Sequence, residues 1–148
     1  SRCPLARAVR IDKMTMAALT ATLVHYVKEE ALDKVPVWRM VSMPLADIEA
    51  RASSWLIKIG DRGEIIDGRS TIGGGSLPGE TLATKLLAVS TPRGSSADAL
   101  AAQLRTGDPP VVGRIDEDRL LLDPRTVLQE QDEELTRAVA RALGEETS

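Results

Sequence analysis

The sequence predicts an α+β domain built around a small, mostly antiparallel sheet. Helical patterns predominate up to Gly60, and short strand-like runs with helices between them follow. Helices and strands that are segregated along a chain are typical of α+β folds. The chain has 148 residues, of which 43% are hydrophobic and 2% aromatic, so it is long enough to bury one core. Because Phe is absent and Trp and Tyr are rare, we expect that core to be aliphatic.

A long helix is predicted near the N-terminus. A short helical turn over 4–10 precedes it, with Pro4 tolerated at the first position. Asp12 is a suitable N-cap, and the helical pattern continues to about Glu30. His25 lies off the apolar side, so we interpret it as a surface or boundary histidine. The apolar stripe repeats at spacings of three and four and consists of Met16, Leu19, Leu23 and Val27.

The next segment is predicted to be extended before a second helix begins. Residues 36–43, PVWRMVSM, have the composition of a strand. Ser42 followed by Pro44 then signals the start of a helix, and Gly60 signals its end. One face of that helix is apolar and carries Leu45, Ile48, Ala52, Trp55 or Leu56, and Ile59.

The second half of the chain carries the predicted strands. Pro124 ends the last of them because proline cannot continue the hydrogen-bond ladder. Ser95 or Ser96 caps a helix that stops at Gly107, and a final helix spans about 132–143. The predicted strands are apolar runs bounded by turn residues at 64–71, 85–91, 111–115 and 119–123, the last two forming a hairpin candidate.

Composition and charge argue against several classes of protein. A net charge of -3 and few aromatic residues are not typical of a free-standing nucleic-acid binder, which is normally basic and offers stacking platforms. The single cysteine, Cys3, permits neither an internal disulfide nor a cysteine zinc cluster and suits a reducing compartment. A Ser-His-Asp triad would have to use His25, the only histidine, and no G-x-S-x-G motif accompanies it. The sequence therefore does not indicate a serine hydrolase of this type. We see no signal-peptide pattern and no apolar run long enough to cross a membrane, so we expect a cytoplasmic protein.

Arg7 and Arg10 are a candidate anion-binding pair. They lie three residues apart, so on a helical turn both side chains leave the same face. Two adjacent guanidinium groups repel each other unless an anion lies between them, and guanidinium binds oxyanions through paired hydrogen bonds. Residues 1–13 also carry a local excess of positive charge, with Asp12 as their one acid. The alternative is that both arginines lie on the surface and pair with carboxylates elsewhere in the protein.

A glycine-rich loop, STIGGGSLPGET over 70–81, is the second candidate. Consecutive glycines allow backbone N–H groups to converge on an anion. The loop is neither a Walker A motif, since no Gly-Lys-Ser/Thr follows, nor a G-x-G-x-x-G fingerprint, since Pro78 stands at the sixth position. Composition alone favours a tight crossover between strands over a ligand cradle. The residues that would line such a cradle are Gly73, Gly74, Gly75 and Ser76.

No other pattern completes an active site. The sequence has no metal-ligand spacing, no activated Cys–His pair and no convincing carboxylate dyad. The neighbouring glutamates at 29–30, 133–134 and 145–146 are expected to be solvated.

Three segments, in this order, resemble a known family. They are PLARAVRIDKMTMAAL (4–19), GGGSLPGE (73–80) and PPVVGRIDEDRLLLDPRTV (109–127). Together they are similar to the C-terminal part of bacterial selenocysteine synthase, L-seryl-tRNA(Sec) selenium transferase. The resemblance implies the small C-terminal domain of a fold-type I pyridoxal-phosphate transferase, preceded by a long helix. It divides the chain into 1–35, with the anion-site turn and connecting helix, and 36–148, the small α+β domain.

The resemblance also implies a reaction and its participants. The family converts seryl-tRNA(Sec) to selenocysteinyl-tRNA(Sec), with selenophosphate as the selenium donor and pyridoxal phosphate as the electron sink. Arginines matching Arg7 and Arg10 help to bind the selenophosphate anion. The family's members are homo-oligomers, and neither a membrane nor DNA is an expected partner.

The cofactor lysine is expected to lie outside this chain. In the family it lies shortly before the segment that begins at Pro4, and no lysine here matches that position; the lysines are Lys13, Lys28, Lys34, Lys58 and Lys85. We therefore expect a fragment that is inactive by itself. Two alternatives stay open: a related fold-type I lyase acting on a phosphorylated amino sugar acid, and a non-catalytic interaction domain.

Overall fold

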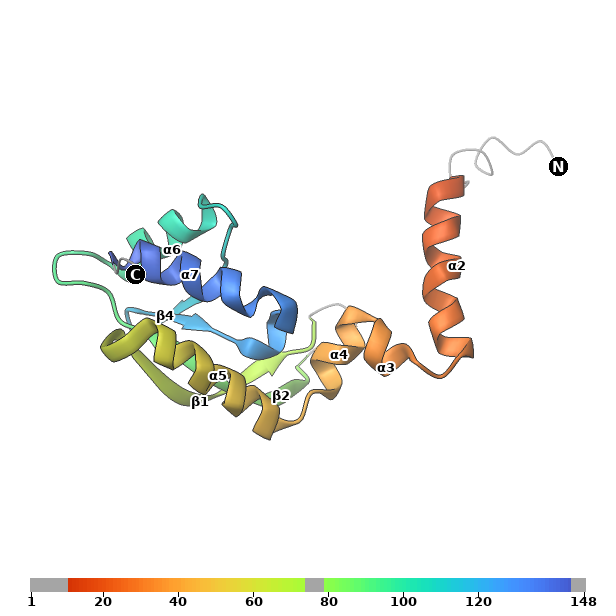
Figure 1. Ribbon diagram of the computed structural model, residues 1–148, viewed down its shortest axis with the longest axis horizontal. Coiled ribbons are helices and arrows are strands. Elements are labelled where there is room, and N and C mark those ends of the chain that lie inside the picture. The colour runs from red at the N-terminus through yellow and green to blue at the C-terminus, as the bar shows by residue number, and fades with distance from the viewer. Residues whose placement is uncertain (1–10, 74–78, 145–148) are drawn as a thin grey trace. The chain divides into compact units, whose positions relative to one another are not determined.

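The structure is a computed structural model that describes residues 11–73 and 79–144 (Figure 1). Contacts between residues divide the chain into two units, Ser1–Ser42 and Met43–Ser148. The predicted division into functional domains 1–35 and 36–148 stays a prediction.

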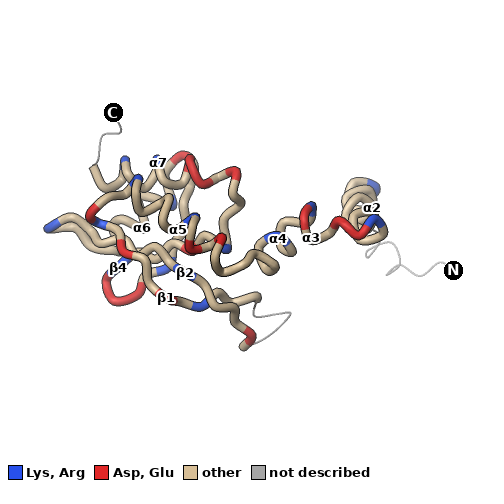
Figure 2. Tube along the Cα trace, turned by 60° about the horizontal axis from the view of Figure 1, so that its bottom comes forward, with Lys and Arg blue, Asp and Glu red and all other residues tan. Residues whose placement is uncertain are grey.

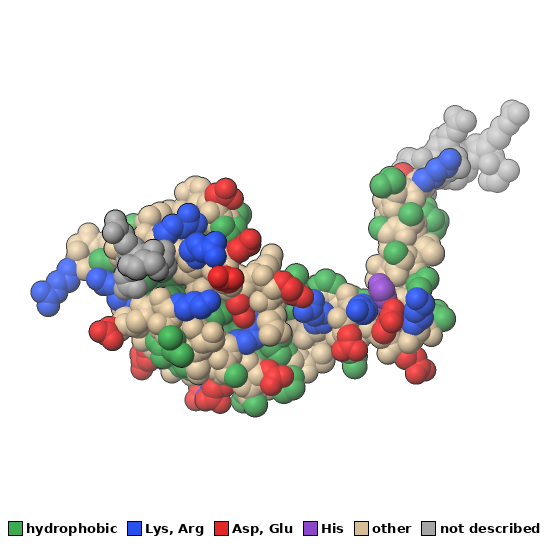
Figure 3. Space-filling model, viewed as in Figure 1, with side chains coloured by type: hydrophobic (Ala, Val, Ile, Leu, Met, Phe, Trp, Pro, Cys, Tyr) green, Lys and Arg blue, Asp and Glu red, His purple; other side chains and the backbone are tan. Residues whose placement is uncertain are grey.

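The helices of the first unit are α2 (Lys13–Val27), α3 (Ala31–Lys34) and α4 (Pro36–Ser42). α2 begins as predicted, because the Asp12 carboxylate accepts hydrogen bonds from the amides of Met14 and Thr15. It ends at Val27, somewhat before the predicted end. None of the residues in these three described helices is buried. The predicted apolar stripe of α2 is exposed, and Figure 3 shows hydrophobic side chains along this helix.

The prediction of an extended segment over 36–43 is wrong, because most of these residues form α4. Val35 is extended, as residues before proline usually are, and Pro36 then occupies the first helical position. The helix begins with hydrogen bonds from the amides of Trp38 and Arg39 to the Val35 carbonyl. The valines and the tryptophan of this segment indicated a strand, but proline at the first turn favours a helix.

The second unit begins with α5 (Leu45–Ile59), close to the predicted start. Pro44 is its N-cap, and Gly60 ends it with a positive φ of 68° that favours glycine. The 3₁₀ helix η1 (Gly60–Arg62) follows directly. The predicted apolar face is confirmed for the buried residues Ile48, Ala52, Trp55 and Ile59, whereas Leu45 is 41% exposed.

A four-stranded antiparallel sheet forms the centre of the second unit, in the order β1-β2-β4-β3. This confirms the predicted α+β class and the small antiparallel sheet. The predicted hairpin of the last two strands is also present, although its first strand is short. The strands are β1 (Gly63–Thr71), β2 (Thr81–Val89), β3 (Arg114–Asp116) and β4 (Arg119–Leu122).

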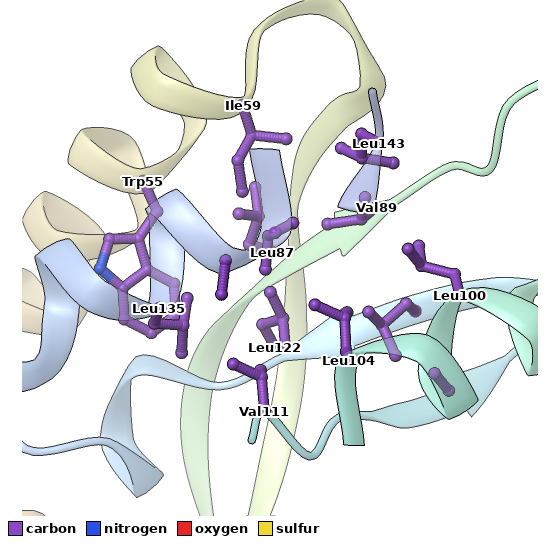
Figure 4. Close-up of a cluster of buried hydrophobic side chains, with 14 residues drawn as sticks. Trp55, Ile59, Leu87, Val89, Leu100, Leu104, Val111, Leu122, Leu135 and Leu143 are labelled. Carbon is purple, nitrogen blue, oxygen red and sulfur yellow. The ribbon is translucent and has the colours of Figure 1, made fainter. Parts of the chain in front are cut away.

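The main core lies between one face of this sheet and three helices (Figure 4). The predicted helices α6 (Ala97–Arg105), capped by Ser96, and α7 (Asp132–Ala142) supply two of them, and α5 supplies the third. The core is aliphatic apart from Trp55, as the composition predicts. Each buried Leu or Val stabilises the fold by about 1.5–3 kcal/mol. The sheet contributes Leu87, Val89, Leu120 and Leu122, the helices add Ile59, Leu100, Leu104, Leu135 and Val139, and the C-cap of α7 adds Leu143.

Two short 3₁₀ helices, η2 (Pro124–Thr126) and η3 (Gln129–Gln131), connect β4 to α7. Pro124 ends the strand as predicted. The first turn of α7 holds three acidic residues and its last turn holds Arg141, a distribution that complements the helix dipole and is visible in Figure 2.

Candidate functional site

Most of the predicted site residues lie outside the described part of the chain. Arg7 and Arg10 precede Ile11, where the description begins, and Gly74, Gly75 and Ser76 lie within the gap at 74–78. Gly73 is described and has a φ of 149°. A Cβ added at Gly73 would meet no atom within 4 Å. The roles proposed for these residues therefore stay predictions.

Asp12, the acidic residue nearest in sequence to Arg7 and Arg10, caps the start of α2. The Asp12 carboxylate accepts hydrogen bonds from the Met14 amide at 2.8 Å and from the Thr15 amide at 3.0 Å. Its other oxygen accepts from the Thr15 hydroxyl at 2.6 Å. This hydroxyl contact is the largest of the influences that lower the pKa of Asp12. Asp12 therefore stays ionised and bound to the start of the helix.

His25 and Glu30 join the end of α2 to the start of α3. His25 Nδ1 lies 2.8 Å from Glu30 Oε1, and both side chains are 35% exposed. His25 is thus partly exposed, which agrees with the predicted surface or boundary position. Its hydrogen bond is the largest cause that lowers the pKa of Glu30. Glu29 takes a positive φ of 58° in the turn between the two helices.

Lys85 is the lysine of the second unit with ion-pair partners. Its ammonium group lies 2.8 Å from Asp67 Oδ1 and 3.8 Å from Glu49 Oε1. The hydrogen bond to Asp67 is the largest cause that raises the pKa of Lys85. Because imine formation needs a neutral amine, a lysine held more strongly protonated is poorly suited to bind a cofactor aldehyde.

A buried polar cluster, which sequence reasoning missed, lies where β4 ends. It consists of Ser70, Thr84, Asp123 and Arg125, here called the Asp123 cluster. Asp123 Oδ2 accepts from the Ser70 hydroxyl at 2.5 Å, and Oδ1 accepts from the Thr84 hydroxyl at 2.8 Å and from the Arg125 amide at 3.0 Å. Ser70, Thr84 and Arg125 are 5%, 1% and 6% exposed. The signal in the sequence is the pair of charged residues, Asp123 and Arg125, that follows the apolar residues LLL of RLLLDPRTV.

A second buried charge lies beside this cluster. Arg51 of α5 donates to the Pro124 carbonyl at 2.7 Å and to the Val127 carbonyl at 3.0 Å, and it pairs with the carboxylate of Asp132. Burying a guanidinium group is costly unless its donors are satisfied, as they are here.

The described residues, 11–73 and 79–144, contain no group of three or more His, Cys, Asp or Glu side chains placed to hold a metal ion. Nor do they contain a helix with the length and apolarity needed to span a membrane.

Comparison with known proteins matches the chain to one family. The family model for L-seryl-tRNA selenium transferase matches residues 1–128. The L-seryl-tRNA(Sec) selenium transferase of Carboxydothermus hydrogenoformans is 38% identical over 145 residues, which are 95% of this chain and 31% of that protein. The enzyme of the same name from Hyphomonas neptunium is 45% identical over 130 residues, which are 84% of this chain and 28% of that protein.

The chain thus spans about a third of the length of the curated relatives it matches. The match includes both α2 and the sheet with its buried Asp123 cluster, so it covers both units of the structure. This coverage shows that the chain belongs to the L-seryl-tRNA selenium transferase family.

Proposed function

We propose that this chain is part of an enzyme that converts seryl-tRNA(Sec) to selenocysteinyl-tRNA(Sec) with selenophosphate as the selenium donor. The observation that carries the proposal is the family match over residues 1–128 together with the names of the relatives. These names favour a transferase over the lyase and over the non-catalytic domain that the sequence left open. The chain would be the small C-terminal domain of a fold-type I pyridoxal-phosphate enzyme that is a cytoplasmic homo-oligomer.

Arg7 and Arg10 are the proposed contacts to selenophosphate. The geometry of Asp12 supports this role, because the one acidic residue in the first 13 hydrogen-bonds to the start of α2. A carboxylate held in this way is a weaker competitor for the two guanidinium groups. A doubly charged oxyanion between them would relieve their mutual repulsion.

The lysines of this chain do not fit covalent attachment of pyridoxal phosphate. Lys85 is held by Asp67 and Glu49, and Lys13, Lys28, Lys34 and Lys58 are exposed. The pyridoxal-phosphate lysine would therefore belong to another part of the full-length enzyme, and the chain alone would be inactive. Incubating the 148-residue chain with pyridoxal phosphate and then borohydride tests this point. We expect no stoichiometric adduct, and one adduct per chain on a single lysine would overturn the assignment.

Substituting the arginine pair tests the anion site in the full-length enzyme. We expect Arg7→Ala or Arg10→Ala to lower kcat/KM for selenophosphate by about tenfold or more, with little change in seryl-tRNA(Sec) affinity. Lys at either position is expected to restore little, because an ammonium group cannot make paired contacts. An equal loss for both substrates would contradict the anion role. Arg105→Ala, an exposed change on α6, is the matched control.

A further inference from the structure

α2 is apolar on all sides, although none of its residues is buried. Between Lys13 and Lys28 the sequence contains no Asp, Glu, Lys or Arg. The apolar stripe is exposed, and so is Met14, which lies on the opposite side of the helix from Leu23. A helix that is hydrophobic all round is normally covered by other protein surfaces.

The helices of the second unit show the contrast. α7 buries Leu135 and Val139 on one side and exposes Glu133, Arg137 and Arg141 on the other. α2 has no charged side of this kind, so its surface suits contact with protein better than contact with water. A helix that lies on a membrane surface would also need a strongly charged side.

The hydroxyl groups of α2 are already satisfied within the helix. The Thr20 hydroxyl donates to the Met16 carbonyl at 2.8 Å, and the Thr22 hydroxyl donates to the Ala18 carbonyl at 3.0 Å. The Thr15 hydroxyl donates to the N-cap carboxylate. Burying a hydroxyl is costly when it loses its hydrogen bonds, and these three keep theirs inside the helix. α2 can therefore be removed from water without leaving these donors unpaired.

α3 and α4 add apolar side chains to this surface within the first unit. The Trp38 indole of α4 donates to the Tyr26 hydroxyl of α2 at 2.5 Å, which ties the two helices together. Leu32 of α3 and Val37 of α4 are exposed as well. A helix of fifteen residues is marginal by itself, so the unit gains most from a partner that covers a wider area than one helix.

The charged residues at the two ends of α2 complement each other (Figure 3). Lys13 begins the helix, and Lys28, Glu29 and Glu30 follow its end with a net negative charge. Lys13 and Glu29 are both exposed. An antiparallel second copy would bring each Lys13 close to Glu29 of the other copy and would oppose the two helix dipoles. A parallel copy would place Lys13 beside Lys13.

The same antiparallel register also aligns the apolar stripes. When Lys13 is level with Glu29 of the other copy, Leu19 is level with Leu23 of that copy, because each lies six residues further inside its helix. An interface between identical chains related by a twofold axis must be complementary to itself, and this surface meets that requirement.

We propose that two copies of this chain associate through α2, with the two helices antiparallel and their apolar stripes in contact. The stripe of each copy consists of Met16, Leu19, Leu23 and Val27, and Lys13 pairs with Glu29 of the other copy at both ends. The proposal uses only the surface of the first unit and does not rest on the proposed function.

Sedimentation of the 148-residue chain over a wide concentration range tests the association. We expect the mass to rise with concentration towards twice the 15.9 kDa of one chain. Leu23→Glu should raise the Kd of the dimer by about tenfold or more, since it places a charge where a leucine is buried. The matched control is Ile57→Glu on α5, where Ile57 is 83% exposed, and it should leave the Kd within about twofold.

Exchanging the end charges tests the antiparallel arrangement. At low salt, Lys13→Glu alone and Glu29→Lys alone should each raise the Kd by about fivefold, because two exposed ion pairs become repulsive. The double variant restores opposite charges in the antiparallel dimer and should return to within about twofold of the original Kd. A double variant that binds no better than the single variants would contradict the antiparallel register.

The remaining outcomes also decide the proposal. A chain that stays monomeric at every concentration would overturn it and would indicate that α2 is covered by the part of the longer relatives that this chain does not include. A dimer that survives Leu23→Glu, or that Ile57→Glu dissociates, would place the interface elsewhere and overturn it as well. These measurements involve no substrate, so a failure of the proposed transferase activity would leave their result unchanged.

Discussion

Arg51 joins three segments of the second unit through one side chain. It is 8% exposed and lies 5.7 Å from the centroid of the Trp55 ring. Its guanidinium group donates to carbonyls in and after η2 and to the carboxylate of Asp132 at the start of α7. Once a charge is buried, removing it leaves several acceptors without a donor.

Replacing Arg51 is therefore expected to lower the free energy of unfolding far more than replacing an exposed arginine. Arg51→Gln should lower the free energy of unfolding by about 3 kcal/mol, the lower end of the range for a broken buried pair. Arg137→Gln is the matched control, because Arg137 is 54% exposed in its pair with Glu133 and should cost less than about 0.5 kcal/mol. Urea unfolding of both variants measures the difference. Similar losses in the two variants would contradict the importance of burial.

The contact between His25 and Glu30 predicts a pH dependence in the first unit. The pKa of Glu30 is lowered from 4.5, chiefly by the His25 hydrogen bond. A lowered pKa means that the contact stabilises the turn above pH 4.5 and that this stabilisation is lost as the pH falls through the lowered pKa. NMR titration of the Glu30 carboxyl should show its pKa rising in His25→Ala. An unchanged Glu30 titration in that variant would show that the contact does not form in solution.

The β1–β2 hairpin depends on a close approach between its two strands. Gly68 of β1 lies under Leu86 of β2, and an added Cβ would be 2.3 Å from Leu86 Cδ1 and 2.7 Å from its Cγ. Leu86 is 2% exposed and belongs to a small second apolar cluster with Ala88 and Leu121. Because Cγ moves only with a rotation about χ1, relief of the clash would require the whole buried Leu86 side chain to turn within a packed core.

We expect Gly68→Ala to lower the free energy of unfolding by about 1–3 kcal/mol through overpacking. Thr71→Ala, an exposed change on the same strand, should stay within about 0.5 kcal/mol of the unmutated chain. Gly68→Ala combined with Leu86→Ala should be less destabilised than the sum of the two single changes, because the second removes the atoms that clash. Strict additivity in thermal or urea unfolding would argue against this contact.

The two units differ in how their helices are stabilised. α2, α3 and α4 contain no buried residue, and α2 exposes Met14 at 81% and Val27 at 84%. α5, α6 and α7 each bury several residues against the sheet. Helical stability in proteins comes mostly from such tertiary packing. The stability of the chain as a whole is therefore expected to reside in the second unit.

A shortened polypeptide tests this expectation directly. Residues 43–148 alone should unfold cooperatively, with a urea midpoint close to that of the whole chain, because every residue of the main core lies in this range. The m-value should fall, since it scales with the surface exposed on unfolding. Circular dichroism and urea titration provide both quantities. A large drop in the midpoint would mean that the first unit stabilises the core.

Signals within a few neighbouring residues were sufficient to predict most of the helices and strands. Caps such as Asp12 and Ser96, and the stop at Gly60, define helix ends through contacts within a few residues. The segment 36–43 was the exception, because its valines and tryptophan favour a strand whereas Pro36 favours the first turn of a helix. For the site, charge and spacing single out Arg7 and Arg10 and the glycine run at 73–75. Their roles stay predictions.

Local signals do not identify the partners of the buried charges, because these partners are distant in the chain. Arg51 and Asp132 are 81 positions apart, and Arg125 and Met43 are 82 apart. Periodicity and capping identify helices and strands from neighbouring residues alone, whereas the resemblance to one family rests on three quoted segments of the sequence. The strand order β1-β2-β4-β3, and the hydrogen bonds of Asp123 and Arg125 to β1 and β2, depend on contacts that exist only after the chain has folded.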